Sequence, residues 1–124
     1  MSDFKHTPEQ ARSALVTALR SGDYKQAEGQ LRRGDRFCCL GVACDLFAKL
    51  EETGHWDPED EEIFRTADGG WGDALLPDTV RRWLNFRTVN GELFSDETSL
   101  AGMNDRGASF ADLAKVIEQG QANA

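Results

Sequence analysis

The stretch Phe37-Cys38-Cys39-Leu40-Gly41-Val42-Ala43-Cys44-Asp45 decides how this sequence folds, because it holds all three cysteines and opens a helical pattern. The apolar residues at helical spacing are Cys39, Val42, Ala43, Leu46, Phe47 and Leu50. We expect a central core helix from Cys38 that ends before Gly54. A glycine inside a helix costs about 1 kcal/mol relative to alanine. Gly41 therefore predicts close approach by a ligand or by a neighbouring backbone, for which we expect the segment 104–105.

Capping patterns mark further helices. Residues 7–22 begin with a Thr-Pro-Glu-Gln capping box, in which Thr7 is the N-cap, and end at a glycine. Another helix begins at Leu76-Pro77-Asp78, with proline at the first helical position. The last helix begins at Ser109, and a short helix before it ends near Gly107.

Extended and irregular segments fill the rest of the chain. Asn90-Gly91 is the strongest hairpin signal, because a two-residue type I′ turn needs positive φ at both positions. Residues 23–36 predict a loop or a short strand, and residues 53–74 an acidic excursion with one short strand near Ile63-Phe64. The sequence thus predicts a helix-rich α+β fold of about four helices, with a small antiparallel hairpin around Asn90-Gly91.

The composition is that of one ordinary domain. With 124 residues, 40% of them hydrophobic, the chain can bury a single core, and we expect one domain over residues 1–124. No apolar run reaches the roughly 18 residues of a membrane helix, and the first residues lack the apolar stretch of a signal peptide. Three cysteines do not fit a disulfide framework. We expect a cytoplasmic protein that makes no membrane contact.

The net charge of −8 is concentrated in one segment. Residues 51–78 hold ten acidic residues against Arg65 alone, a net of −9, so the rest of the chain sums to +1. Such a surface repels phosphates, and we expect no direct nucleic-acid binding through it. A solvated loop, a mimic of nucleic acid and a docking site for a basic partner all fit this charge.

Three cysteines and two histidines raise the question of a zinc site, but the spacing argues against one. Adjacent Cys38 and Cys39 would point about 100° apart on a helix, and Cys44 follows Cys39 by five residues. None of these pairs has the Cys-x-x-Cys spacing that presents two sulfurs together. We expect no metal site and no cofactor, with the cysteines serving as small apolar core residues.

A cysteine nucleophile is a sharper hypothesis, because the first turn of a helix lowers the pKa of a thiol. Cys38 or Cys39 would attack, His55 would be the base, and Asn104 or Asp105 would orient it, in the order found in papain-like enzymes. However, His55 lies in the acidic excursion, where an exposed loop histidine is the simpler interpretation. We favour a protein without enzymatic activity and keep a cysteine-dependent hydrolase as the alternative.

Several polar and aromatic residues favour a binding site instead. The loop that leads to the core helix, together with the helix N-terminus, can receive an anion or a carbonyl-rich ligand. Two tryptophans of the acidic excursion can either anchor a partner or pack the excursion onto the core. The candidate binding residues are Tyr24, Gln26, Arg36, Cys38, Gly41, Trp56, Trp71, Asn104 and Asp105.

Two motifs resemble a family of small uncharacterised proteins from phages, prophages and actinobacterial genomes. The first is the aromatic-Cys-Cys-Leu-Gly-Val element at residues 37–42, and the second is Asn104-Asp105 before the last helix. The resemblance covers roughly residues 10–50 and 76–120. Its less close relatives keep both motifs without an equivalent of His55, so the resemblance weakens the hydrolase hypothesis. The resemblance implies the kind of genome that encodes the protein, but no biochemical activity.

From these observations we expect a small phage-type accessory protein that acts by binding, in the host cytoplasm if a phage encodes it. The partner is either a host protein, which docks on the acidic excursion with its tryptophans, or a small ligand near Cys38 and Asn104. An inhibitor of a host defence system is one concrete version. A structural subunit of an oligomer is a third hypothesis, and the sequence leaves the partner and the oligomeric state open.

Overall fold

The computed structural model describes residues 4–89, 91 and 99–122, and of the last three residues the backbone alone. Within this part the helices are α1 (Pro8–Ser21), α2 (Cys39–Glu51), α3 (Asp78–Leu84), α4 (Leu100–Asp105) and α5 (Phe110–Ala122). The strands are β1 (Lys25–Gln26), β2 (Arg32–Arg33), β3 (Arg36–Phe37), β4 (His55–Trp56), β5 (Phe64–Arg65) and β6 (Trp71–Gly72). The predicted helix-rich α+β class is confirmed, with two small three-stranded sheets.

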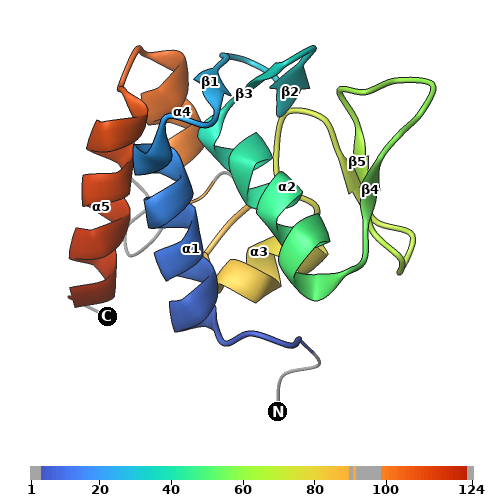
Figure 1. Cartoon of the computed structure of the whole chain (residues 1–124), viewed down its shortest axis with the longest axis horizontal. Helices are drawn as coiled ribbons and strands as arrows, with labels where there is room; N and C mark the ends of the chain where they lie inside the picture. The colour runs from blue at the N-terminus through green and yellow to red at the C-terminus, as the bar shows by residue number, and fades with distance from the viewer. Residues whose placement is uncertain (1–3, 90, 92–98, 123–124) are drawn as a thin grey trace.

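The cysteine-bearing helix α2 is central, as the sequence predicts. It packs against α1, α3 and α4, and α1 lies between α2 and α5 (Figure 1). The buried side chains of α2 include Cys39, Val42, Ala43, Cys44 and Phe47. Burying a side chain as large as Phe47 contributes roughly 2–3 kcal/mol. No helix in the described part of the chain is long and apolar enough to cross a membrane.

The helix starts follow the capping patterns closely. Thr7 Oγ1 accepts a hydrogen bond from the Gln10 amide at 3.2 Å, and the Gln10 side chain accepts one from the Thr7 amide at 2.9 Å. Ser109 and Asp112 form the same reciprocal pair at the start of α5. Helix α3 begins one residue later than predicted, because Pro77 is its N-cap rather than its first residue.

The first sheet lies beside the start of α2, with the strand order β1-β3-β2. β3 pairs in parallel with β1 and antiparallel with β2. Side chains directly opposite each other on paired strands lie on the same face of a sheet. The exposed row, which we call the arginine row, is Lys25, Arg36 and Arg33. The opposite, half-buried row is Gln26, Phe37 and Arg32.

The second sheet organises the acidic excursion, with the antiparallel order β4-β5-β6. Its exposed row, which we call the Trp71 row, is His55, Arg65 and Trp71. The opposite row is Trp56, Phe64 and Gly72, of which Phe64 and Gly72 are buried. The excursion is therefore a small ordered sheet with one face on the core, rather than a loop with a single strand.

The hairpin predicted around Asn90-Gly91 falls partly outside the described residues, which omit 90 and 92–98. Its first arm, residues 86–89, forms bends and a turn, so the prediction of a strand there is wrong. The backbone of this arm bonds elsewhere: the Val89 carbonyl accepts from the Leu76 amide at 3.0 Å. The Gly91 carbonyl likewise accepts from the Leu100 amide at 3.2 Å.

The close approach predicted at Gly41 is confirmed, but the neighbour is a different segment. A Cβ at this position would lie 1.8 Å from the carbonyl oxygen of Leu31. That oxygen accepts a hydrogen bond from the Cys38 amide at 3.1 Å, which holds the chain before β2 against the first turn of α2. The segment 104–105 approaches the same turn at Cys39 instead. No space is left for a ligand at Gly41.

Replacing Gly41 with alanine tests this contact. The new methyl group would overlap the Leu31 carbonyl, so one backbone must move. The free energy of unfolding, measured with urea, should fall by about 3 kcal/mol or more. Gly102→Ala in α4 is the matched control, because its nearest neighbour is the end of the Ser99 side chain at 3.0 Å. That variant should stay within about 1 kcal/mol of the wild type, and equal losses in both variants would contradict the account.

Candidate functional site

Asn104 is a buried amide that joins three distant segments at the start of α2. Its Oδ1 accepts hydrogen bonds from the Cys39 amide at 3.3 Å and from Nε2 of Gln26 at 2.9 Å. Its Nδ2 donates to the Ala27 carbonyl at 2.7 Å. The residue has 0% of its surface exposed. Both polar atoms of the side chain thus already have protein partners, as a buried amide requires.

Gln26 and Asp105 extend this connection. Nε2 of Gln26 also donates to the Ala108 carbonyl at 2.7 Å. Asp105 Oδ1 accepts from the Gly29 amide at 2.8 Å. We call this set of bonds the Asn104 joint. The structure therefore brings the predicted residues Gln26, Asn104 and Asp105 together, but as a connection between segments rather than as an open ligand pocket.

The three cysteines are buried next to the joint. Cys38 is the N-cap of α2, and its Sγ accepts from the Gly41 amide at 3.4 Å. Cys39 Sγ donates to the Leu100 carbonyl at 3.6 Å. Burial raises the pKa of Cys38 to about 11 and those of Cys39 and Cys44 well above the ordinary value. Burial outweighs the helix start that was expected to lower these values, so the thiols stay protonated at neutral pH.

His55 does not face the cysteines. Its neighbour Trp56 packs against Phe37 and Phe64, and successive side chains of a strand point to opposite faces. His55 therefore points outward, in the exposed Trp71 row. Asn104, which would orient the base, is engaged in the joint. The geometry thus gives the Cys-His-Asn arrangement no support, and in the described residues no cluster of His, Cys, Asp and Glu could hold a metal ion.

Asp45, at the end of the cysteine motif, binds two of the predicted site residues. Tyr24 donates its hydroxyl to Oδ2 at 2.6 Å, and Trp56 donates Nε1 to Oδ1 at 3.3 Å. Lys49 Nζ lies 3.0 Å from Oδ2. Burial by itself raises the pKa of Asp45, but the bonds from Tyr24, Lys49 and Trp56 together hold it below its ordinary value. Asp45 is thus a half-buried, ionised link from α2 to Tyr24, just before β1, and to Trp56 of β4.

A series of aromatic rings continues this link through the core. The edge-to-face pairs are Tyr24–Phe37, Phe37–Trp56, Trp56–Phe64, Phe64–Phe47 and Phe47–Trp83, with centroids 5.0 to 6.4 Å apart. Each such pair is worth about 0.5–1.5 kcal/mol beyond area burial. The Arg32 guanidinium lies 5.4 Å from the Trp56 ring centroid. Trp56 therefore packs the excursion onto the core and is not free to anchor a partner.

Glu51 is counted in the acidic segment but does not belong to its surface. Its side chain is 3% exposed, and it accepts from the Lys5 and His6 amides, from His6 Nδ1 and from Trp83 Nε1. Burial raises its pKa, yet these donors hold the pKa below its ordinary value. Glu51 thus connects residues 5–6, which precede α1, with α2 and α3. Because its donors outweigh the effect of burial, the carboxylate stays charged inside the protein.

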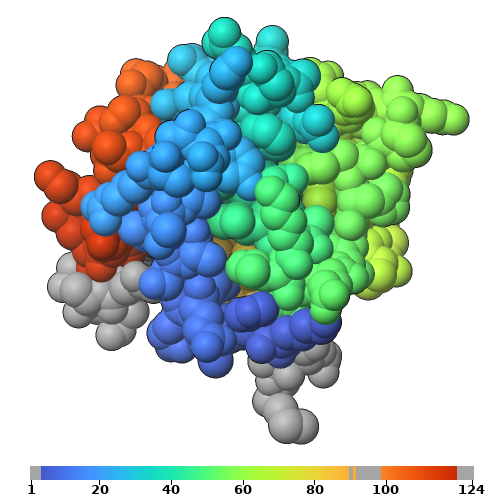
Figure 2. All heavy atoms as spheres, in the orientation of Figure 1, coloured from blue at the N-terminus to red at the C-terminus, as the bar shows by residue number. Residues whose placement is uncertain are grey.

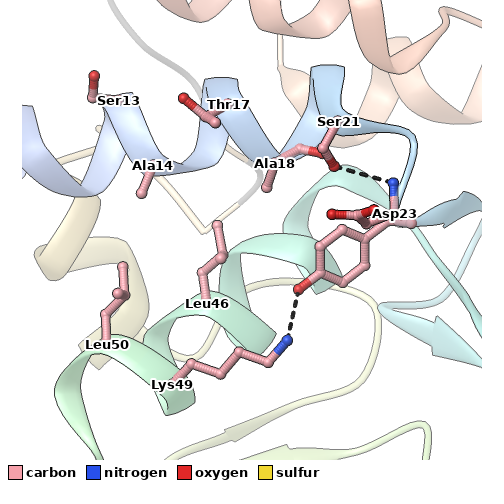
Figure 3. A pocket seen from close by; sticks show the side chains of 10 residues that line it. Ser13, Ala14, Thr17, Ala18, Ser21, Asp23, Leu46, Lys49 and Leu50 are labelled. Carbon is pink, nitrogen blue, oxygen red and sulfur yellow. Dashed lines mark hydrogen bonds between the residues drawn. The ribbon is translucent and has the colours of Figure 1, made fainter.

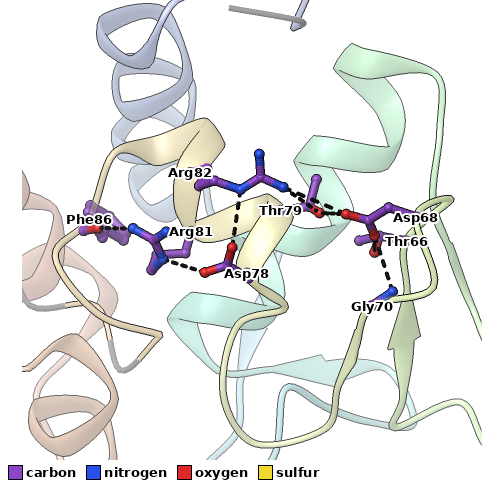
Figure 4. A network of polar contacts seen from close by, with 8 residues as sticks. All are labelled: Thr66, Asp68, Gly70, Asp78, Thr79, Arg81, Arg82 and Phe86. Carbon is purple, nitrogen blue, oxygen red and sulfur yellow. Dashed lines mark hydrogen bonds and ion pairs between the residues drawn. The ribbon is translucent and has the colours of Figure 1, made fainter.

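Further carboxylates of the segment are engaged by local donors, as Figure 4 shows. Asp68 accepts from the hydroxyls of Thr66 and Thr79 and from the Gly70 amide, and these bonds lower its pKa to about 2. Asp78 forms ion pairs with Arg81 at 2.8 Å and Arg82 at 3.1 Å. These two acids are therefore parts of the scaffold around α3.

The charge that remains exposed lies in the turn between β4 and β5. Asp57, at its start, pairs with Arg65 at 2.5 Å. Within the acidic segment 51–78, the carboxylates without an ion pair to any described residue are Glu59, Asp60, Glu61 and Glu62 of this turn, and Asp73. The pairing of Phe64 with Gly72 places Asp73 at the same end of the sheet as the turn. This turn extends away from the rest of the chain (Figure 1), and the same segment projects from the surface in Figure 2.

Trp71 is a predicted binding residue that remains exposed instead of packing on the core. It is 58% exposed, and Leu75, which follows it closely in the chain, is 40% exposed. Among the described residues these are the exposed large apolar side chains. Arg36, another predicted residue, is also exposed and lies in the arginine row.

Two hollows lie on the surface of the described residues, away from the cysteines. A groove of about 540 Å³ runs between α1 and α2, where small side chains of α1 face Leu46 and Leu50 (Figure 3). Tyr24 lines one end, but its hydroxyl is already bonded to Asp45 and Lys49. The other hollow, of about 520 Å³, lies above Glu51 and Phe47. Neither contains the cysteines.

Sequence reasoning missed three residues on which the site depends. Leu31 contacts Gly41 through its backbone carbonyl, and no side-chain pattern reports such a contact. Glu51 and Asp45 look like surface acids of a helix, because the partners that hold their carboxylates come from distant segments.

Comparison with known proteins places the chain in one family. Residues 9–121 match the family described as a domain of unknown function, DUF8296. The chain belongs to this family. No curated protein and no solved structure matches the chain. The family match thus covers nearly the whole described chain, but the description of the family names no activity.

Removing the Asn104 amide should unfasten the joint. Asn104→Ala leaves the Cys39 amide, the Ala27 carbonyl and one Gln26 donor without partners in the interior. The free energy of unfolding should fall by about 3 kcal/mol in urea denaturation. The exposed neighbour is the control: Asp105→Ala, which removes one bond to Gly29, should cost about 1 kcal/mol or less. A stable Asn104→Ala variant would contradict the joint.

Raised thiol pKa values predict slow alkylation and a loss of stability in alkali. The folded pKa of Cys38 is about 11 against an ordinary 9.0, so the folded state holds its proton more tightly than the unfolded state does. That stability is fully present below pH 9 and is lost as the pH rises through 11. Iodoacetamide should react with the native thiols at pH 7 far more slowly than with the urea-unfolded chain. Fast labelling of one native cysteine would restore the nucleophile hypothesis.

Proposed function

We propose that the protein is a small accessory protein that acts by binding another protein through the exposed face of the β4-β5-β6 sheet. Trp71 carries this proposal. A tryptophan side chain with 58% of its surface in water leaves a large apolar area exposed, whereas Trp83 is buried in the core and Trp56 is partly buried against it. Tryptophan is among the residues that most often dominate the energy of protein interfaces.

The sheet holds Trp71 on a firm base. Its backbone pairs with Arg65 of the central strand, and Arg65 is tied by its ion pair to Asp57. Beneath the sheet, Phe64 is fully buried and contacts Phe47 of α2. A side chain presented on such a base loses little conformational freedom on binding, which favours affinity.

The charge beside this face indicates a basic partner. Five carboxylates have no ion pair to any described residue, and they lie at one end of the sheet that bears Trp71: Glu59, Asp60, Glu61, Glu62 and Asp73. Opposite charge on the partner would raise the association rate and select among partners. Residues such as Arg65 and His55 in the same row would meet polar groups at the rim.

We propose a phage or prophage setting on the strength of the two motifs that resemble such proteins. Inhibition of a host defence protein is the concrete form that we favour, because an acidic surface beside an apolar anchor suits a nucleic-acid-handling target. The alternative version, a small ligand near Cys38, has less support: Leu31 occupies the space at Gly41, and Asn104 bonds to protein groups.

Trp71→Ala tests the binding face directly. The residue packs no core element, so the free energy of unfolding should change by about 0.5 kcal/mol or less. In affinity capture from lysate of the organism that encodes the chain, proteins retained by the wild type should fall about tenfold or more. Lys115→Ala on the exposed side of α5 is the control and should capture normally.

Two further results bear on the same face. Glu59→Gln, Glu61→Gln and Glu62→Gln together should weaken capture and reduce its salt dependence, because they remove charge without touching Trp71. Capture of the same proteins in equal amounts by wild type and Trp71→Ala would overturn the proposal. Sedimentation that shows an oligomer lost on Trp71→Ala would instead favour the structural-subunit hypothesis.

A further inference from the structure

The arginine row on the other sheet presents three cations side by side. Register pairs Arg33 with Arg36 across β2 and β3, and Arg36 with Lys25 across β1 and β3. Residues opposite each other on paired strands have Cβ atoms about 5 Å apart, and like charges in that relation destabilise a sheet. All three side chains are exposed. The strand register thus holds three like charges next to one another on one face of the sheet.

The two arginines form no ion pair with any described residue, although Glu28 and Asp35 lie nearby. Among the described residues neither Arg33 nor Arg36 forms an ion pair or a side-chain hydrogen bond, while Lys25 pairs with Asp35 at 3.1 Å. Acidic residues outnumber Lys and Arg by 22 to 14 in this chain, so acids are not scarce. An arginine pair left free in an acidic protein leaves its guanidinium donors open to an external anion.

A hollow lies beside the pair. It has a volume of about 420 Å³ and is lined by Gln26, Ala27, Glu28, Arg33 and Arg36. Its floor is fixed, because Gln26 and Ala27 are both held by Asn104. The β2–β3 turn that sets the arginine spacing has Gly34 at φ 62°, a conformation that glycine adopts without strain. The joint described above therefore holds one side of this hollow in place.

We propose that Arg33 and Arg36 bind the phosphate group of a small ligand in this hollow. Two guanidinium groups offer parallel N–H donors that match phosphate oxygens in bidentate fashion. The net charge of −8 repels an extended polyanion such as nucleic acid, which favours a compact phosphate or diphosphate over a strand. Glu28 lines the hollow and Asp105 is bonded to the adjacent Gly29 amide, so both carboxylates weaken anion binding.

Isothermal titration of the full chain with inorganic pyrophosphate tests the site. The wild type should bind saturably at one site with a Kd of about 1 mM or below. Arg33→Gln combined with Arg36→Gln should weaken binding at least tenfold, and Arg36→Lys by several fold, because lysine keeps the charge but loses the bidentate donors. Glu28→Gln should tighten binding by a few fold, because it removes a repulsive charge. Lys115→Gln is the control and should bind as the wild type does.

A stability measurement separates this role from a structural one. Neutralising Arg36 relieves like-charge repulsion in the row, so the Arg36→Gln protein should melt at the same temperature as the wild type or higher. A lowered melting temperature would mean that the arginines hold the sheet together, which contradicts the proposal. Pyrophosphate binding that is absent at about 10 mM, or equal in the double variant, would overturn it. So would a 20-nucleotide single strand that binds tighter than pyrophosphate.

Discussion

The buried Asn104 amide is the interaction on which the rest of the structure depends. It bonds to Gln26, to the Ala27 carbonyl and to the Cys39 amide, and thereby holds three segments at the start of α2. Such a group is costly when left unpaired in the interior. The bonds therefore specify one arrangement of the first sheet, the central helix and α4. Close packing of Leu31 on Gly41 completes that arrangement.

This constraint keeps the cysteine motif buried. The residues that look reactive in the sequence are kept apart: Cys38 and Cys39 are buried beside the joint with raised pKa values, and His55 is exposed on the outer face of the second sheet. What stays accessible is carried by the two sheets. One presents Trp71 beside free carboxylates, and the other presents unpaired arginines beside a hollow. The motif is thus a structural connection that positions both exposed faces.

The helices could be predicted from the sequence because their signals are local. Thr7 with Gln10, and Ser109 with Asp112, cap their helices through side chains three residues apart. Gly41 correctly predicted a close contact, but not its partner, because that partner is the backbone of Leu31, ten residues away in the sequence. Asn90-Gly91 failed as a strand predictor for residues 86–89 because tertiary bonds such as that of Val89 with Leu76 override local turn preference. Both sheets have strands of two residues, too short for any alternation pattern to reveal.

Amide hydrogen exchange at Cys39 and Gly41 tests the central claim most directly, because it reports whether the start of α2 opens on its own. If the motif is a closed connection, both amides should exchange only by global unfolding, with the opening free energy that urea denaturation gives for the whole protein. Opening free energies several kcal/mol lower than that value, with the rest of α2 still protected, would contradict it. The turn would then be a gate to a pocket, and the cysteines would again be candidates for function.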